Sequence, residues 1–302
     1  MNTRQWTQIG LAVLWLNPLS ICAQEPAAAS LDTAKIEQLT GIKGKLDPAE
    51  QVFKLSQPRA DLAVTVAGVK MTPAMGFTSW AAFLSTGKQV MVMGDMVLLE
   101  DQIDAVMSAA LEHGIEVTAL HNHFLWETPR ILFMHVAGRG DLDSMAAGIG
   151  KVFAAIKGTG NPKHRQGPRT EIDAAQTSLD PKAIETLLGV APEKNGEVYK
   201  VTIGRTTRVD GHPAGKVMGV NTWAAFAGSD QNAVVDGDFA MRESELQGVL
   251  KALRRGGISI TAIHHHMVNE SPKIVFLHYW GTGSVSDLAK AIKTALATQS
   301  SS

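Results

Sequence analysis

Two segments of the chain carry the same set of potential metal ligands. Residues 117–138 read VTALHNHFLWETPRILFMHVAG, and residues 260–281 read ITAIHHHMVNESPKIVFLHYWG. The shared residues are 143 positions apart: His121, His123, Glu127 and His135 in the first segment, and His264, His266, Glu270 and His278 in the second. Repetition at a fixed period marks a duplicated structural unit, and imidazole and carboxylate groups are common ligands of transition metals.

The spacing of these residues predicts a metal site in each segment. Side chains two positions apart in a strand point to the same face, so the first two histidines of each segment share a face. The third joins them if the hairpin register allows it, and a shift of one residue would send it to the other face. Three neutral imidazoles and a carboxylate suit Zn, Mn, Fe, Ni or Cu, with a position left for water. We therefore predict a divalent metal ion as cofactor.

Two other interpretations of the histidines are open: a histidine-lined site without metal, and a structural hydrogen-bonding role. Metal binding is preferred because seven of the ten histidines of the chain fall in the two segments. The His-x-His-x-x-x-Glu spacing is similar to the first motif of the cupins. Cupins are all-β, however, and a predicted helix precedes each segment here, so we attribute the similarity to convergent ligand spacing.

The glutamates Glu127 and Glu270 are the predicted catalytic residues. As general bases outside the metal ligands, they would take a proton from water and later deliver it to the leaving group. As a fourth metal ligand, each would leave the role of base to a second carboxylate such as Asp95. Asp95 and its counterpart Asp238 each follow a glycine, and at a strand end turn chemistry explains them equally well.

Composition indicates a globular protein with room for two domains. The 302 residues are 45% hydrophobic and 19% charged, with a net charge of −1, so no basic surface for nucleic acid is expected. We expect a small-molecule substrate. The sequence has no P-loop, dinucleotide-binding or Gly-x-Ser-x-Gly motif.

The N-terminus predicts export. Residues 1–23 have the pattern of a signal peptide, with Arg4 ahead of an apolar run at 11–16 that is too short to span a bilayer. This predicts a periplasmic or secreted protein without a membrane span. A lipid anchor on Cys22 is the second interpretation, because Ile21 fits poorly where a lipobox needs a small residue. Cleavage after residue 23 would leave a mature protein without a thiol.

The repetition extends over most of the chain. For example, GFTSWAAF at 76–83 returns as GVNTWAAF at 219–226. We predict two homologous units at 31–157 and 179–298, joined by a linker at 158–178 that is rich in glycine and proline.

Strand and helix patterns alternate within each unit. In the first, residues 89–96 predict a strand, 98–112 a helix, 115–124 and 130–136 two strands of a hairpin, and Asp141 the start of another helix. This order predicts an α+β fold of two tandem homologous units, each an antiparallel sheet with helices packed on one face. Trp80 and Trp223 are predicted as core anchors rather than substrate platforms. Met91, Met93 and Met96 are predicted as core residues rather than copper ligands.

The doubled Thr-Ala-x-His-x-His…Glu-x-Pro…Phe-x-His pattern, the Gly-x-x-x-Trp-Ala-Ala-Phe stretches and the export signal together resemble the LppY/LpqO family. This family of exported bacterial proteins is typified by mycobacterial lipoproteins and classed as a domain of unknown function. The resemblance covers residues 31–297. It implies an exported, often lipid-anchored protein and gives no activity, so function has to be inferred from the site.

The residues favour a metal-dependent hydrolase of a small ester or lactone, in which a histidine-bound metal activates water. Two alternatives stay open. One is a periplasmic metal-binding or metal-buffering protein without turnover, and the other is an envelope interaction module in which the histidines are incidental.

Overall fold

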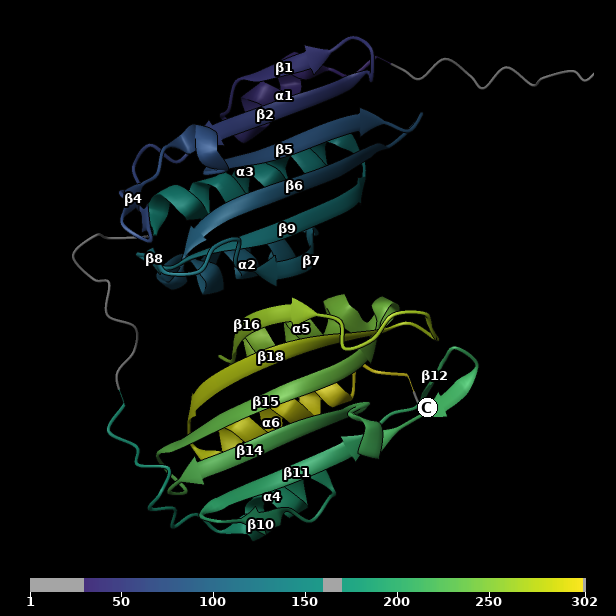
Figure 1. The fold of residues 1–302 in the computed structure, drawn as a ribbon. Helices are drawn as coiled ribbons and strands as arrows, with labels where there is room; N and C mark the ends of the chain where they lie inside the picture. The colour runs from purple at the N-terminus through teal and green to yellow at the C-terminus, as the bar shows by residue number, and fades with distance from the viewer. Residues whose placement is uncertain (1–29, 160–169, 301–302) are drawn as a thin grey trace, which may run out of the picture.

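The computed structural model describes residues 30–159 and 170–300, which form two repeats of the same architecture (Figure 1). The predicted signal peptide and part of the predicted linker lie outside the described residues. Among the described residues, no helix is long and apolar enough to cross a membrane.

Each repeat has the same fourteen elements in the same order. The first comprises α1 (Thr33–Thr40), β1 (Gly44–Asp47), β2 (Val52–Pro58), β3 (Thr65–Val66), β4 (Val69–Lys70), the 3-10 turn η1 (Pro73–Met75), β5 (Thr78–Ser85), β6 (Val90–Leu99), η2 (Glu100–Gln102), α2 (Ile103–Glu112), β7 (Glu116–His121), β8 (Glu127–Thr128), β9 (Ile131–Gly140) and α3 (Leu142–Gly158). The second comprises α4 (Pro181–Leu188), β10 (Glu193–Asn195), β11 (Val198–Gly204), β12 (Thr207–Val209), β13 (His212–Ala214), η3 (Lys216–Met218), β14 (Asn221–Gly228), β15 (Ala233–Arg242), η4 (Glu243–Glu245), α5 (Leu246–Arg255), β16 (Ser259–His264), β17 (Glu270–Ser271), β18 (Ile274–Gly283) and α6 (Val285–Leu296). The predicted α+β fold of two repeated units is confirmed.

The two repeats share one antiparallel sheet of 12 strands, in the order β1-β2-β5-β6-β9-β7-β16-β18-β15-β14-β11-β10. The order is symmetric about the junction of β7 and β16, where Leu120 pairs with its own repeat counterpart, Ile263. A pseudo-twofold axis therefore passes through this pair. The Gln247 side chain of α5 strengthens the junction, because it bonds both the N–H and the C=O of Val117 on β7.

The helices cover one face of the sheet (Figure 1). Helix α2 buries Ile103, Val106, Met107, Ala110 and Leu111, which are spaced to form one apolar stripe. Helix α3 begins as predicted after Asp141, whose side chain accepts a hydrogen bond from the Ser144 N–H. The predicted helix at 98–112 starts later, because β6 continues to Leu99 and a 3-10 turn precedes α2.

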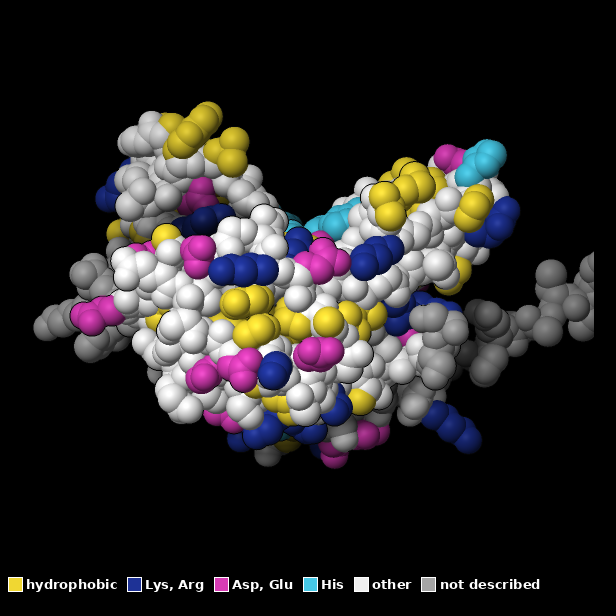
Figure 2. Space-filling model, turned by 90° about the horizontal axis from the view of Figure 1, so that it is seen from below, with side chains coloured by type: hydrophobic (Ala, Val, Ile, Leu, Met, Phe, Trp, Pro, Cys, Tyr) yellow, Lys and Arg dark blue, Asp and Glu magenta, His cyan; other side chains and the backbone are white. Residues whose placement is uncertain are grey.

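The other face is open over its centre. Small three-stranded sheets, β4-β3-β8 and β13-β12-β17, form two arms at its margins, and Figure 2 shows a hollow between two ridges with histidine side chains at its floor. The side chains of Met91 and Met93 are 37% and 55% exposed. By strand alternation they lie on this open face, so their prediction as core residues is wrong. The same prediction for Met96 is confirmed, because Met96 is fully buried in the core.

Trp80 and Trp223 also lie on the open face. Both are only partly buried, whereas their neighbours Ala81 and Ala224 point into the helix-covered core. The prediction that the tryptophans anchor the core is therefore wrong.

Candidate metal centre

Neighbouring strands bring polar residues of the open face into one row. In the first repeat, Trp80 on β5 is opposite Asp95 on β6, and Asp95 is opposite His135 on β9. Residues directly opposite in an antiparallel pair point to the same side of the sheet. The second repeat has the same row, built from Trp223, Asp238 and His278.

The hairpin register places all three histidines of each repeat on this face. His121 is opposite Phe133, and His135 is opposite Ala119, so the two histidines are offset by two positions and keep the same side. The His121 ring centroid lies 5.1 Å from that of His123 and 5.1 Å from that of His135. The prediction that the third histidine shares the face of the other two is confirmed.

In the second repeat, three side chains could hold a metal ion. One ligand atom each from Asp238, His264 and His266 lies within 4.8 Å of the others. Asp238 Oδ2 is 3.2 Å from His266 Nε2. Asp238 Oδ1 and His264 Nε2 are buried and have no hydrogen-bond partner among the described residues. Buried polar atoms normally have partners, and a cation bound between these two would supply one.

His278 lies beside this triad. Its ring centroid is 4.7 Å from that of His264, and the rings are stacked. Its Nδ1 lies 3.4 Å from the Gly237 carbonyl oxygen. A proton on Nδ1 would be donated to that carbonyl, which leaves Nε2 as the basic nitrogen. His278 is therefore suited either to accept a proton or to act as a fourth ligand.

Burial sets the protonation of the centre. It raises the pKa of Asp238 above its ordinary value, with the three neighbouring histidines acting in the opposite direction. It lowers the pKa of His264, against the effect of the Asp238 charge. Neutral imidazoles beside a carboxylate that has lost its hydration suit metal binding, because a cation compensates the cost of the buried negative charge.

The first repeat holds the same residue types on the equivalent strands. Asp95 is buried, its Oδ1 has no hydrogen-bond partner among the described residues, and burial raises its pKa. Burial also lowers the pKa of His123. Among the described residues, however, only the triad of the second repeat has its ligand atoms within 4.8 Å of one another. The better-formed candidate is therefore in the second repeat.

The predicted catalytic glutamates lie in the arms. Glu127 on β8 pairs with Val66, and Glu270 on β17 pairs with Val209. Glu270 Oε1 accepts a hydrogen bond of 3.4 Å from the Ile274 N–H. The structure does not group these carboxylates with the histidines as metal ligands, and their catalytic role stays a prediction.

The carboxylates that face the histidines are Asp95 and Asp238. The interpretation that they end strands is wrong, because β6 and β15 run four residues beyond them, to Leu99 and Arg242. A signal was present in the sequence: each is an acid within an apolar strand, and it recurs at the repeat offset.

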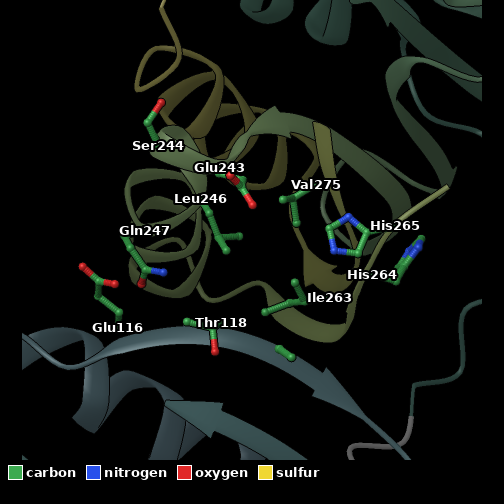
Figure 3. Close-up of a pocket in the computed structure, with 11 residues that line it drawn as sticks. Glu116, Thr118, Glu243, Ser244, Leu246, Gln247, Ile263, His264, His265 and Val275 are labelled. Atoms are coloured by element: carbon green, nitrogen blue, oxygen red, sulfur yellow. The ribbon is translucent and has the colours of Figure 1, made fainter. Parts of the chain in front are cut away.

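A cavity of about 540 Å³ opens beside His264 at the boundary between the repeats. Figure 3 shows Glu116 and Thr118 of β7 on one side of it, Gln247 of α5 on another, and His265 near His264. Of the four side chains of the second repeat's centre, only His264 is among the residues that line this cavity.

The fold and the site define a tandem-repeat α+β protein with a candidate metal centre on an open sheet face. A family model described as a domain of unknown function (DUF1259) matches residues 34–155 and 182–298. The chain belongs to this family and contains the domain twice. No curated protein and no solved structure matches the chain. The resemblance to the LppY/LpqO family stays a prediction.

Proposed function

We propose that the protein is an exported, metal-dependent hydrolase of a small ester or lactone, with its principal centre in the second repeat. The observation that carries the proposal is the triad of Asp238, His264 and His266, with two buried ligand atoms that lack a partner among the described residues. Its position on the open face of the sheet supports access for a small substrate (Figure 2).

A divalent cation held by these three residues would supply Lewis-acid activation of water near neutral pH. The protein must also supply a proton acceptor within hydrogen-bond reach of that water. His278 is one candidate, because a proton on its Nδ1 would be donated to the Gly237 carbonyl and would leave Nε2 as the basic nitrogen. Glu270 is the other candidate. Because Glu270 lies on β17 of the arm, the arm would have to approach the substrate for this residue to act as the base.

The first repeat is proposed to bind a second ion independently. Its histidine rings stack on one another, as do those of the second repeat. Each repeat therefore has a ligand set of its own.

A metal-binding protein without turnover is the second candidate, favoured by the presence of the same residue types in both repeats. A hydrolase needs only one competent centre, whereas storage or delivery of metal gains from two.

Elemental analysis of the purified full chain, combined with a panel of chromogenic esters and lactones, tests the proposal. We expect bound metal, turnover, and loss of turnover after chelation that is reversed by added Zn²⁺, Mn²⁺ or Fe²⁺. Fe²⁺ is included because two histidines and one carboxylate are also the ligand set of non-haem iron enzymes. Metal without turnover would favour storage, and turnover that is unaffected by chelation would contradict the proposal.

A further inference from the structure

A lysine stands over Trp80 and another over Trp223 on the open face. Lys54 Nζ lies 4.3 Å from the ring centroid of Trp80, and Lys200 Nζ lies 4.1 Å from that of Trp223. An ammonium group over an indole face is attracted by the ring quadrupole, so the ring fixes the position of the charge. Both repeats therefore hold a cation at the same place.

The surroundings of these pairs have diverged between the repeats. Several positions of the same face differ, among them Met91, Met93, Ala137 and Arg139 in the first repeat, which correspond to Val234, Asp236, Trp280 and Thr282 in the second. The lysine, the tryptophan, the aspartate and the three histidines are unchanged. Packing places little constraint on an uncovered face, so retention of the lysine and the tryptophan in both repeats favours a role that they share with the metal centre.

Some lysines of the described residues pair with a carboxylate, and these two do not. Lys35, Lys43, Lys194 and Lys273 each have a carboxylate oxygen within 4.0 Å. Lys54 and Lys200 are absent from the ion pairs of the described residues. Each is a positive charge held over an indole without a carboxylate to neutralise it.

The location of this charge fits one part of a small substrate. Trp223 is directly opposite Asp238, a metal ligand in the proposed function, and neighbouring strands are about 4.8 Å apart. By the same spacing, the lysine ammonium over the indole lies about 5–10 Å from Asp238. That is the span of a few carbon–carbon bonds.

We propose that each Lys–Trp pair is a subsite for an anionic group of the substrate. The lysine binds a carboxylate or phosphate, and the tryptophan positions the lysine. This inference rests on the proposed function and narrows its substrate to an ester or lactone that carries a carboxylate or phosphate a few bonds from the scissile bond. The first repeat has Met93 where the second has Asp236, so Lys54 faces less competing negative charge.

The kinetic test compares 4-nitrophenyl hydrogen glutarate with 4-nitrophenyl valerate, which has a methyl group in place of the carboxylate. The full-length, metal-loaded protein is expected to prefer the glutarate ester. The double variant carries Lys54→Met and Lys200→Met. In this variant, kcat/KM for the anionic ester divided by kcat/KM for the neutral ester should fall about tenfold, as for a lost charged hydrogen bond. Lys200→Arg should restore most of the ratio.

Lys194→Met is the matched control. Lys194 also lies over an aromatic ring, at 5.8 Å from the Tyr199 centroid, but it is on edge strand β10 and pairs with Glu197. It should leave the ratio unchanged. An unchanged ratio in the double variant, or an equal fall in Lys194→Met, would overturn the inference.

Binding without turnover separates the inference from the proposed function. Calorimetric titration of the full chain with glutarate, and separately with inorganic phosphate, should show binding. In the double Lys54→Met and Lys200→Met variant, the affinity should fall about tenfold or more. Preference for one anion identifies carboxylate or phosphate as the natural group. If no ester or lactone is hydrolysed but these anions bind through the lysines, the hydrolase proposal fails and the anion subsite stands. If neither anion binds, the subsite is refuted whatever the catalytic result.

Discussion

Asp238→Asn should remove most of the stabilisation that metal gives to the second repeat. The residue is 3% exposed, its Oδ2 lies 3.2 Å from His266 Nε2, and it is the one carboxylate of the triad. An asparagine keeps the shape but loses the charge. Loss of a partner that only orients a metal ligand costs about 10–100-fold in affinity, so we expect loss of the carboxylate itself to cost at least about 100-fold.

The size of the effect follows from ligand linkage. At a free metal concentration of about 100 Kd, bound metal stabilises the folded protein by about 2.7 kcal/mol. A change of 1 kcal/mol moves Tm by about 2–4 °C in proteins of about 150–250 residues, which predicts a rise of about 5–11 °C. A site weakened 100-fold is half-saturated at the same concentration and contributes about 0.4 kcal/mol, or about 1–2 °C.

Thermal unfolding followed by circular dichroism, with and without metal, measures this difference. Both proteins should carry Asp95→Asn, so that the first repeat contributes little. Asp236→Asn is the matched control, because Asp236 is exposed and lies two residues away on the same strand. An equal rise with and without Asp238→Asn would refute the assignment of Asp238 as a ligand. No rise in the unsubstituted protein with any metal tested would refute the site.

Three further outcomes are expected. Glu270→Gln should keep the bound metal and slow hydrolysis by about 10²–10⁴-fold, the range for loss of a general base. Loss of metal in elemental analysis would instead make Glu270 a ligand. No change in metal content or rate would exclude both roles. His121→Ala and His264→Ala should each remove one of two bound ions, because the rings stack within each repeat; loss of both ions in either variant would contradict separate sites. Burial opposes ionisation of Glu245, but backbone hydrogen bonds and the charge of Arg205 outweigh it, and the pKa lies below the ordinary 4.5. Its stabilising contribution is therefore present above that value and is lost as the pH falls through the lower folded-state pKa, so Glu245→Gln should flatten the dependence of Tm on pH between about pH 5 and 3.

The duplication and the histidine hairpins could be predicted because both are local patterns that the chain repeats. The role of the aspartates could not, because Gly94-Asp95 is also a common turn signal. The structure gives another reason for that glycine. A Cβ on Gly94 would lie 2.7 Å from the Trp80 carbonyl oxygen, and one on Gly237 would lie 2.4 Å from that of Trp223. The glycine permits close packing in mid-strand, so the aspartate that follows it stays within the strand and faces the histidines.

The exposed tryptophans and the joined sheet depend on tertiary contacts that leave little trace in the sequence. Ala-Ala-Phe after a tryptophan resembles a buried strand, and β5 is indeed buried on one side only. Which side carries the tryptophan depends on where the helices pack. The junction of the repeats has one backbone pair, Leu120 with Ile263, and both are ordinary apolar residues of an amphipathic strand.

The position of the pseudo-twofold axis bears on how the two centres relate. His121 follows Leu120, and His264 follows Ile263, so each histidine is one residue from the pair on the axis. An axis perpendicular to a sheet relates residues on the same face, which puts both centres on the open side and close to the junction. Each histidine nevertheless stacks on the third histidine of its own hairpin, His135 or His278. The duplication therefore places two sets of candidate ligands on one face of the sheet, and the histidines of each set come from a single repeat.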